Sequence, residues 1–160
     1  MSQEERHGTR DRSYSAWHRR QSTRRYIGIE KATLLAMIDL DASLYVEYDD
    51  GTKEPLVLIE TAQDIGQAYK SATVTCNLAK MANLPCYVVL YTLSPDLNLA
   101  DREWLDIASF RIKRLYPAPE RGWRIVTPQE WAQGLLKMRE WKAGKLDKQF
   151  DFGAGVAAPP

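Results

Sequence analysis

The sequence predicts an α/β domain, in which helices flank a mixed β-sheet of about four or five strands. Two patterns carry this prediction. Apolar runs at 55–62 and 86–93 enclose an amphipathic stretch at 64–82, which indicates a right-handed βαβ unit with parallel strands. In addition, Asp50-Gly51 separates the strand-like residues 37–49 from 55–62. This dipeptide is a strong signal of an antiparallel hairpin, because both of its residues tolerate positive φ.

The other elements follow in chain order. Residues 14–20 and 30–36 are expected to form short helices, with a polar loop at 21–25. The helix at 64–82 is expected to end before Asn83 and Pro85, and a further strand is expected near 107–116, followed by a turn-rich connection at 117–122. Thr127-Pro128-Gln129-Glu130 predicts the start of a helix that runs to about Trp141. Thr127 can cap this helix, Pro128 suits its first turn and Glu130 can complete a capping box.

Composition limits the class of protein. The 160 residues suffice for one core, and the 44% hydrophobic and 27% charged content is that of ordinary globular chains. No apolar run reaches the roughly 20 residues that span a bilayer. The two cysteines form neither a disulfide framework nor a CxxC zinc pair, which suits a reducing compartment. We therefore expect a cytoplasmic protein that does not enter membranes. Residues 1–12 are expected to be a disordered basic arm, 13–142 a single domain and 143–160 a mobile tail.

Arginines crowd the first 25 residues, although the net charge of the whole chain is only +1. Such a basic segment can neutralise phosphates and release counterions. Arg19, Arg20, Arg24 and Arg25 are the candidate nucleic-acid contacts. The alternative is a solvated segment with no ligand. A second basic cluster, Arg111 with its neighbours Lys113 and Arg114, could line a phosphate track or form a solvated strand face. Four tryptophans of the C-terminal half could stack on bases, but positions in helices and strands favour core packing: Trp104, Trp123, Trp131 and Trp141.

The hairpin carries the candidate site. Alternation along strand 37–49 places Asp39 and Asp41 on one face, while Leu44 and Val46 point to the core. Counting outward from a two-residue loop puts Asp41 opposite Glu60, and opposite residues share a face.

Two carboxylates side by side repel each other, and burial raises the cost. A divalent cation removes this objection, since Mg²⁺ is commonly held by one or two carboxylates together with water and phosphate oxygens. Mn²⁺ suits the same ligands. Such an ion can orient a phosphate and lower the pKa of an attacking water. The alternative is an acidic surface patch that holds no ion.

The run IDLDASLYVEYDDGTKEPLVLIETA resembles the core of PD-(D/E)xK nuclease-like proteins, particularly small phage and prophage members. These proteins show a paired-acid strand, an acidic hairpin and an apolar strand that ends in E-x-K. The resemblance covers roughly residues 14–93, including the expected helix with Lys70 and the strand in LPCYVVLYT that follows it. It implies a restriction-endonuclease-like fold and magnesium-dependent cleavage of DNA. It also implies that Asp41 is the metal-binding aspartate, with Asp39 as a nearby alternative, and that Glu60 is the acid of E-x-K.

The chain departs from the family at the lysine of E-x-K, which is Ala62 here. In the family that lysine is thought to position or activate water and to stabilise charge. Lys70 could replace it from the following helix, and Gln63 is a weaker substitute because it carries no charge. A third interpretation is that the site binds metal or nucleic acid and cleaves nothing.

The leading expectation is a metal-dependent phosphodiesterase that acts on DNA. Asp41, Glu60 and Lys70 would be its catalytic residues, and Asp41, Glu60 and Asp39 would hold Mg²⁺ or Mn²⁺. The alternative is a catalytically inactive protein of the nuclease fold that binds nucleic acid or a host protein. Resolvase-like members of the fold act as dimers, so the resemblance leaves a homodimer open.

Overall fold

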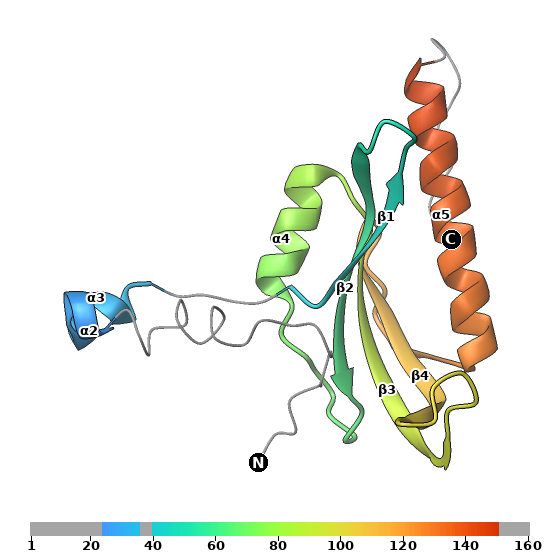
Figure 1. Cartoon of the computed structure of the whole chain (residues 1–160), viewed down its shortest axis with the longest axis horizontal. Coiled ribbons are helices and arrows are strands. Elements are labelled where there is room, and N and C mark those ends of the chain that lie inside the picture. The colour runs from blue at the N-terminus through green and yellow to red at the C-terminus, as the bar shows by residue number, and fades with distance from the viewer. Residues whose placement is uncertain (1–23, 36–39, 151–160) are drawn as a thin grey trace. The chain divides into compact units, whose positions relative to one another are not determined.

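The computed structural model describes residues 24–35 and 40–150 (Figure 1). The chain divides into two compact units at the boundary between Asp39 and Leu40. The first contains two short helices, α2 (Arg24–Ile27) and α3 (Ile29–Thr33), separated by Gly28. A helix was expected only from residue 30, so the turn of α2 is a difference from the prediction. The predicted arm at 1–12 and the helix at 14–20 lie outside the described residues.

The second unit is built on one five-stranded sheet whose strands lie side by side in chain order. Strands β1 and β2 pair antiparallel, β2 and β3 pair parallel, and β3, β4 and β5 pair antiparallel. The sheet is therefore mixed, and the predicted α/β class is confirmed. The bounds of the elements, in chain order, are β1 (Ala42–Glu47), β2 (Lys53–Gln63), α4 (Thr73–Ala82), β3 (Cys86–Leu97), β4 (Leu105–Tyr116), β5 (Arg124–Val126) and α5 (Pro128–Phe150).

The two long helices cover opposite faces of this sheet (Figure 1). On the α5 face, Met138 packs with buried side chains of β2, β3 and β4, and Trp131 lies edge-on to Tyr87 with ring centroids 6.5 Å apart. On the α4 face, Ala79 packs with Leu58 and Cys86. The α5 face is the more continuous apolar layer, whereas the α4 face also carries charged side chains. The candidate site therefore lies on the α4 face.

The hairpin differs from the prediction in two places whose effects cancel. Its loop has three residues rather than two, because Tyr48 pairs with Thr52 and Gly51 occupies the left-handed region at φ 82°. Further along, Leu44 pairs with Val57 but Tyr45 pairs with Pro55.

Leu56 is the residue left unpaired by this register shift, which makes it a β-bulge. Leu56 and Val57 both pack into the core on the α5 face, as expected for neighbours at a bulge. Beyond the bulge, Ala42 pairs with Ile59, which is the register predicted from the sequence. The residue before Ala42 therefore comes to the level of Glu60.

The predicted helix at 64–82 is wrong over its first half. Helix α4 begins only at Thr73, and residues 64–72 form an irregular connection, called here the 64–72 segment. The side chain of Asp64 accepts a hydrogen bond from Gly66, whose φ is 82°, and this turn is not helical. Two of the residues that gave the segment its helical periodicity are exposed, Ile65 by 82% and Tyr69 by 70%.

The C-terminal elements confirm one local prediction and extend another. Thr127 and Glu130 form the expected capping box: the Thr127 N–H donates to the Glu130 carboxylate, and the Glu130 N–H donates to the Thr127 hydroxyl. Helix α5 then continues to Phe150, beyond the expected end near Trp141. Strand β5 was not predicted, since it has only three residues. None of the helices in the described part of the chain is long and apolar enough to cross a membrane.

Candidate functional site

Asp41, Glu60 and Lys70 come together on the α4 face of the sheet. The Lys70 ammonium nitrogen lies 3.1 Å from Oε2 of Glu60 and 3.6 Å from Oδ2 of Asp41. The two carboxylates therefore share one cation, which offsets the repulsion between them. The predicted juxtaposition of these three side chains is present in the structure.

Glu60 is the buried member of this group, with 3% of the residue exposed. A buried carboxylate is costly unless it is paired and hydrogen-bonded. Lys70 supplies the charge, and the hydroxyl of Thr75, in the first turn of α4, donates a hydrogen bond to Oε1. Both oxygens of Glu60 are therefore engaged, and its position is fixed from two elements.

Asp41 lies at the start of β1 and is the more exposed carboxylate, with 34% of its side chain accessible. Its Oδ2 accepts a hydrogen bond of 2.7 Å from the backbone N–H of Thr61, the residue after Glu60. Its other oxygen, Oδ1, accepts no hydrogen bond from any residue that the structure describes. Asp41 is thus held by β2 but keeps one oxygen free to bind a ligand.

Lys70 reaches the carboxylates because the 64–72 segment is anchored to the sheet. Arg111, on β4, donates to both oxygens of Asp64 over 2.9 and 2.8 Å and to the carbonyl of Gln67 over 2.7 Å. Hydrogen bonds from the Arg111 guanidinium, the backbone N–H of Gly66 and the attraction of the Arg111 charge lower the pKa of Asp64 below its usual value. This bidentate pair fixes the beginning of the segment.

Trp123 anchors the middle of the same segment. Its indole N–H donates to the carbonyl of Ala68 over 3.2 Å. The Arg111 guanidinium carbon lies 4.9 Å from the ring centroid and the Lys113 ammonium nitrogen 5.8 Å, both within cation–π range. Trp123 is therefore neither a plain core residue nor an isolated surface one, since it connects the segment to β4.

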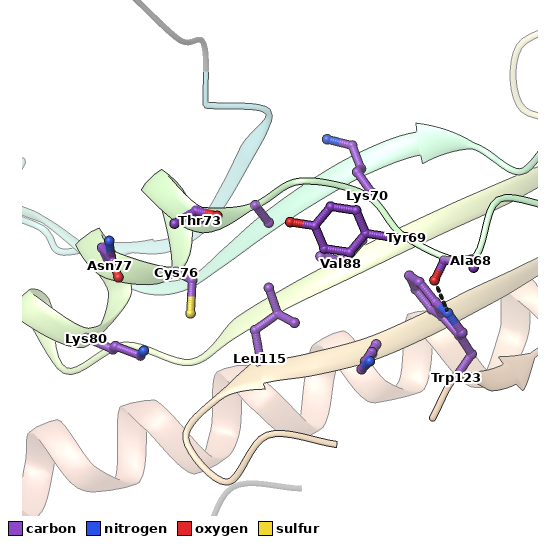
Figure 2. A pocket seen from close by; sticks show the side chains of 12 residues that line it. Ala68, Tyr69, Lys70, Thr73, Cys76, Asn77, Lys80, Val88, Leu115 and Trp123 are labelled. Carbon is purple, nitrogen blue, oxygen red and sulfur yellow. Dashed lines mark hydrogen bonds between the residues drawn. The ribbon is translucent and has the colours of Figure 1, made fainter. Parts of the chain in front are cut away.

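A cavity of about 290 Å³ adjoins this group through Lys70, which lines it (Figure 2). Lys70 forms part of its wall, and the rest comes from the 64–72 segment, from α4, from β3 and β4, and from the residue before β5. Residue by residue, the lining is Ala68, Tyr69, Lys70, Ala72, Thr73, Cys76, Asn77, Lys80, Val88, Lys113, Leu115 and Trp123. The carboxylate pair and a cavity large enough for a small ligand are thus neighbours.

The structure also separates the alternatives for the missing lysine. Ala62 shares a face with Glu60 and packs with Ala72 and Leu90, so the lysine position of E-x-K is filled by core packing. Gln63 alternates to the other face and is exposed, and it is therefore badly placed to substitute. Lys70 supplies the cation at this site instead.

The remaining predicted residues lie elsewhere or are not described. Arg24 and Arg25 belong to α2 of the first unit, where Arg25 stacks on Tyr26 at 5.8 Å from its ring centroid. Asp39, Arg19 and Arg20 lie outside the described residues, so the structure does not bear on their predicted roles. Sequence reasoning missed Asp64 and Thr75, because no local pattern pairs residues so far apart in the chain.

Two carboxylates are a small set of ligands for a metal ion, and the Lys70 ammonium cannot add to it because it has no free electron pair. The part of the chain that the structure describes contains no group of three or more His, Cys, Asp or Glu side chains that could hold one. A hard cation such as Mg²⁺ needs fewer protein ligands when phosphate oxygens and water complete its shell. Oδ1 of Asp41, which accepts no hydrogen bond from a described residue, fits that mode of binding, whereas Oε2 of Glu60 would have to exchange Lys70 for the ion.

Comparison of the chain with protein-family models, with curated proteins and with solved structures finds no match.

Proposed function

We propose that this protein is a divalent-metal-dependent phosphodiesterase that cleaves DNA, in the manner of cytoplasmic, phage-type PD-(D/E)xK nucleases. The observation that carries the proposal is the convergence of Asp41, Glu60 and Lys70, with the Lys70 ammonium 3.1 Å from one carboxylate and 3.6 Å from the other. Two acids and a lysine beside a cavity are the residue types that this chemistry uses.

Each side chain has a role that follows from its surroundings. Asp41 and Glu60 would hold Mg²⁺ or Mn²⁺, with Asp39 close in the chain as a further acid. When bound, the ion would lower the pKa of an attacking water and stabilise the leaving oxygen. Lys70 has a flexible four-carbon stem, so its ammonium group can leave the carboxylates and bind the phosphate of the substrate. Thr75 keeps Glu60 in place during this exchange.

The order of elements supports a restriction-endonuclease-like fold. An antiparallel hairpin carries the two acids, a helix follows, and the next strand pairs parallel to the second strand of the hairpin. This is the arrangement that the resemblance in the sequence implies. The arginines near the N-terminus would bind the DNA backbone through Arg19, Arg20, Arg24 and Arg25, and a homodimer would suit a resolvase-like substrate.

A second candidate is a nuclease-fold protein that binds nucleic acid or a host protein and does not cleave. Two observations favour it. Ala62 stands in the lysine position, and the Lys70 ammonium already pairs with both carboxylates. On this account the ion pair is structural, and the charged face is a binding surface.

Cleavage of supercoiled plasmid DNA in Mg²⁺ or Mn²⁺ distinguishes the two candidates. The first candidate, a nuclease, should nick the plasmid, and EDTA should abolish this activity. Glu60→Gln and Asp41→Asn should each reduce the rate at least about a hundredfold, as loss of a key catalytic interaction does. The matched control is Glu47→Gln, an exposed acid of β1 paired with Lys53, which should keep full activity. DNA binding without any cleavage by the unsubstituted protein would support the second candidate and overturn the first.

Metal binding gives a separate readout. Because the Lys70 ammonium occupies the space between the carboxylates, Lys70→Gln should bind Mn²⁺ more tightly than the unsubstituted protein. Glu60→Gln should bind it more weakly. Titration by calorimetry or by the electron paramagnetic resonance of free Mn²⁺ measures both. If Lys70→Gln and Glu60→Gln leave the affinity unchanged, the ion does not bind between these side chains.

A further inference from the structure

The cavity beside the carboxylates is lined by one sign of charge. Lys70, Lys80 and Lys113 contribute to its wall, and no Asp or Glu does. Lys70 is engaged with Glu60 and Asp41, but neither Lys80 nor Lys113 has a carboxylate within 4 Å among the residues that the structure describes. Two ammonium groups are thus left to interact with an anion, such as a phosphate of a nucleic-acid strand, which carries one negative charge.

The same cavity offers aromatic surface. Tyr69 is 70% exposed, and Figure 2 shows its ring reaching from the 64–72 segment toward the side chains of α4. Trp123 also lines the cavity and is held in place by its hydrogen bond to Ala68, the residue before Tyr69. Exposed rings beside lysines are the combination by which proteins bind unpaired bases, since every base has a face that can stack.

Polar groups on α4 complete the lining. Asn77 and Thr73 line the cavity from one side of the helix, and both are exposed. An amide carries two donors and an acceptor, and a hydroxyl both donates and accepts, so these groups can bind the edge of a heterocycle. The cavity therefore combines charge, an aromatic face and hydrogen-bonding groups.

The sheet places this cavity next to the carboxylates. Glu60, Val88 and Lys113 form one row across β2, β3 and β4, because Val88 pairs with both of the others. Adjacent strands are about 4.8 Å apart, so Lys113 stands roughly 10 Å from Glu60 along the row. That separation is on the scale of one nucleotide unit.

We propose that this cavity binds one nucleotide of a single-stranded or unpaired segment, with its base on Tyr69 and its phosphate on Lys80 and Lys113. The proposal deepens the proposed function, on which it rests for the idea that the nucleotide adjoins the bond to be cleaved. Binding itself needs no catalysis. Tyr69 and Lys70 are adjacent in the chain, so an occupied cavity and the carboxylates would contact the same DNA strand.

Binding of deoxynucleoside 5′-monophosphates, measured by calorimetry at low salt, tests the site directly. Thymidine and deoxyadenosine monophosphates should bind at least about fivefold more tightly than either inorganic phosphate or the free nucleosides, because base and phosphate contribute together. Lys80→Gln and Lys113→Gln should each weaken binding about threefold or more, and Tyr69→Ala about fivefold or more.

Matched controls come from elsewhere in the same unit. Lys137→Gln removes an exposed lysine of α5, on the opposite face of the sheet, and Tyr45→Ala removes a ring that is 50% exposed on β1. Neither should change the affinity. Any of three results would overturn the proposal. Phosphate could bind as tightly as the nucleotides, the control variants could lose as much nucleotide affinity as the cavity variants, or no saturable binding could be found at millimolar concentration.

The nuclease proposal and this one fail in different ways. Nucleotide binding that depends on Tyr69 and Lys80, in a protein that never cleaves DNA, would retain the cavity assignment and reject the catalytic one. The converse result is DNA cleavage that is lost in Glu60→Gln but unchanged in Tyr69→Ala at subsaturating DNA, in a protein that binds no nucleotide. That result would reject the cavity assignment alone.

Discussion

At the scale of single residues, the site depends on a buried carboxylate that is stabilised by one ammonium group. Lys70→Gln would leave Glu60 with the hydroxyl of Thr75 but without a charge partner. Breaking such a pair leaves an uncompensated buried charge, so the free energy of unfolding should fall by about 2 kcal/mol. Urea denaturation measures this change.

The control for that prediction is Lys53→Gln. Lys53 pairs with Glu47 at 3.7 Å, but both side chains are more than half exposed. Exposed pairs contribute less than about 1 kcal/mol, so this variant should unfold almost as the unsubstituted protein does. Equal losses in the two variants would mean that Glu60 is solvated rather than buried.

Asp64 gives a prediction about pH. Its pKa is lower in the folded protein than the ordinary value of 3.8, because of its hydrogen bonds with Arg111 and Gly66. Between the two pKa values the unfolded chain binds more protons, so this stabilisation is complete above pH 3.8 and is lost as the pH falls through the folded value.

The stability difference between the unsubstituted protein and Asp64→Asn measures that contribution. It should be constant from neutral pH down to about pH 5 and shrink as the pH falls below the ordinary carboxyl pKa. Thermal unfolding followed by circular dichroism at each pH gives the comparison. A difference that persists unchanged at pH 2 would show that the Arg111 pair does not depend on the charge of Asp64.

The sequence predicted the pairing of Asp41 with Glu60 but not the side chains that hold them. Strand alternation and a hairpin count suffice to bring two carboxylates to one face. Thr75 contacts Glu60 from 15 positions along the chain, and Arg111 contacts Asp64 from 47 positions. Both contacts depend on the course of the irregular 64–72 segment. Periodicity carries no information about such contacts, so only three-dimensional packing reveals them.

At the scale of elements, the hairpin loop makes a specific prediction. Gly51 has φ 82°, and a Cβ built there would meet nothing within 4 Å. Gly51→Ala should therefore lose about 1 kcal/mol of stability from backbone strain alone. Gly122 is equally open but has no positive φ, so Gly122→Ala should be neutral or slightly stabilising. Chemical denaturation of the two variants tests this, and similar losses in both would contradict it.

Elements were predictable where local chemistry decides them. The capping box at Thr127 and the apolar strands at β2 and β3 follow from residue type alone. The helical spacing of Ile65 and Tyr69 predicts a helix over the 64–72 segment, but both side chains are exposed and the segment is irregular. Strand β5 forms because β4 offers an edge to pair with, and three residues carry no periodic signal of their own.

At the scale of the whole unit, the two faces of the sheet differ in the kind of side chain that they carry. The α5 face is covered by apolar side chains, whereas the α4 face carries the carboxylates, the lysines and the cavity. Stability should therefore depend strongly on α5. Met138 is 4% exposed, and Met138→Ala should cost about 2–4 kcal/mol in the free energy of unfolding.

Leu136 provides the comparison, since it lies on the same helix and is 53% exposed. Leu136→Ala should change the free energy of unfolding by less than about 0.5 kcal/mol. Urea unfolding of both variants measures the difference. A loss at Leu136 as large as that at Met138 would mean that α5 is covered on both sides, by another copy of the chain or by a partner.

The three-residue loop and the bulge at Leu56 have a consequence for how this sequence can change over time. In this sequence, either feature without the other would place Asp41 opposite a residue whose side chain points to the other face of the sheet. Only the loop and the bulge together align Asp41 with Glu60. That alignment depends on which residues pair and not on the number of residues between the pairs, so a deletion within the loop leaves it intact while Tyr48 still pairs with Thr52. Removal of Leu56 would likewise close the bulge without moving Asp41 away from Glu60, because Leu44 and Tyr45 keep their partners Val57 and Pro55.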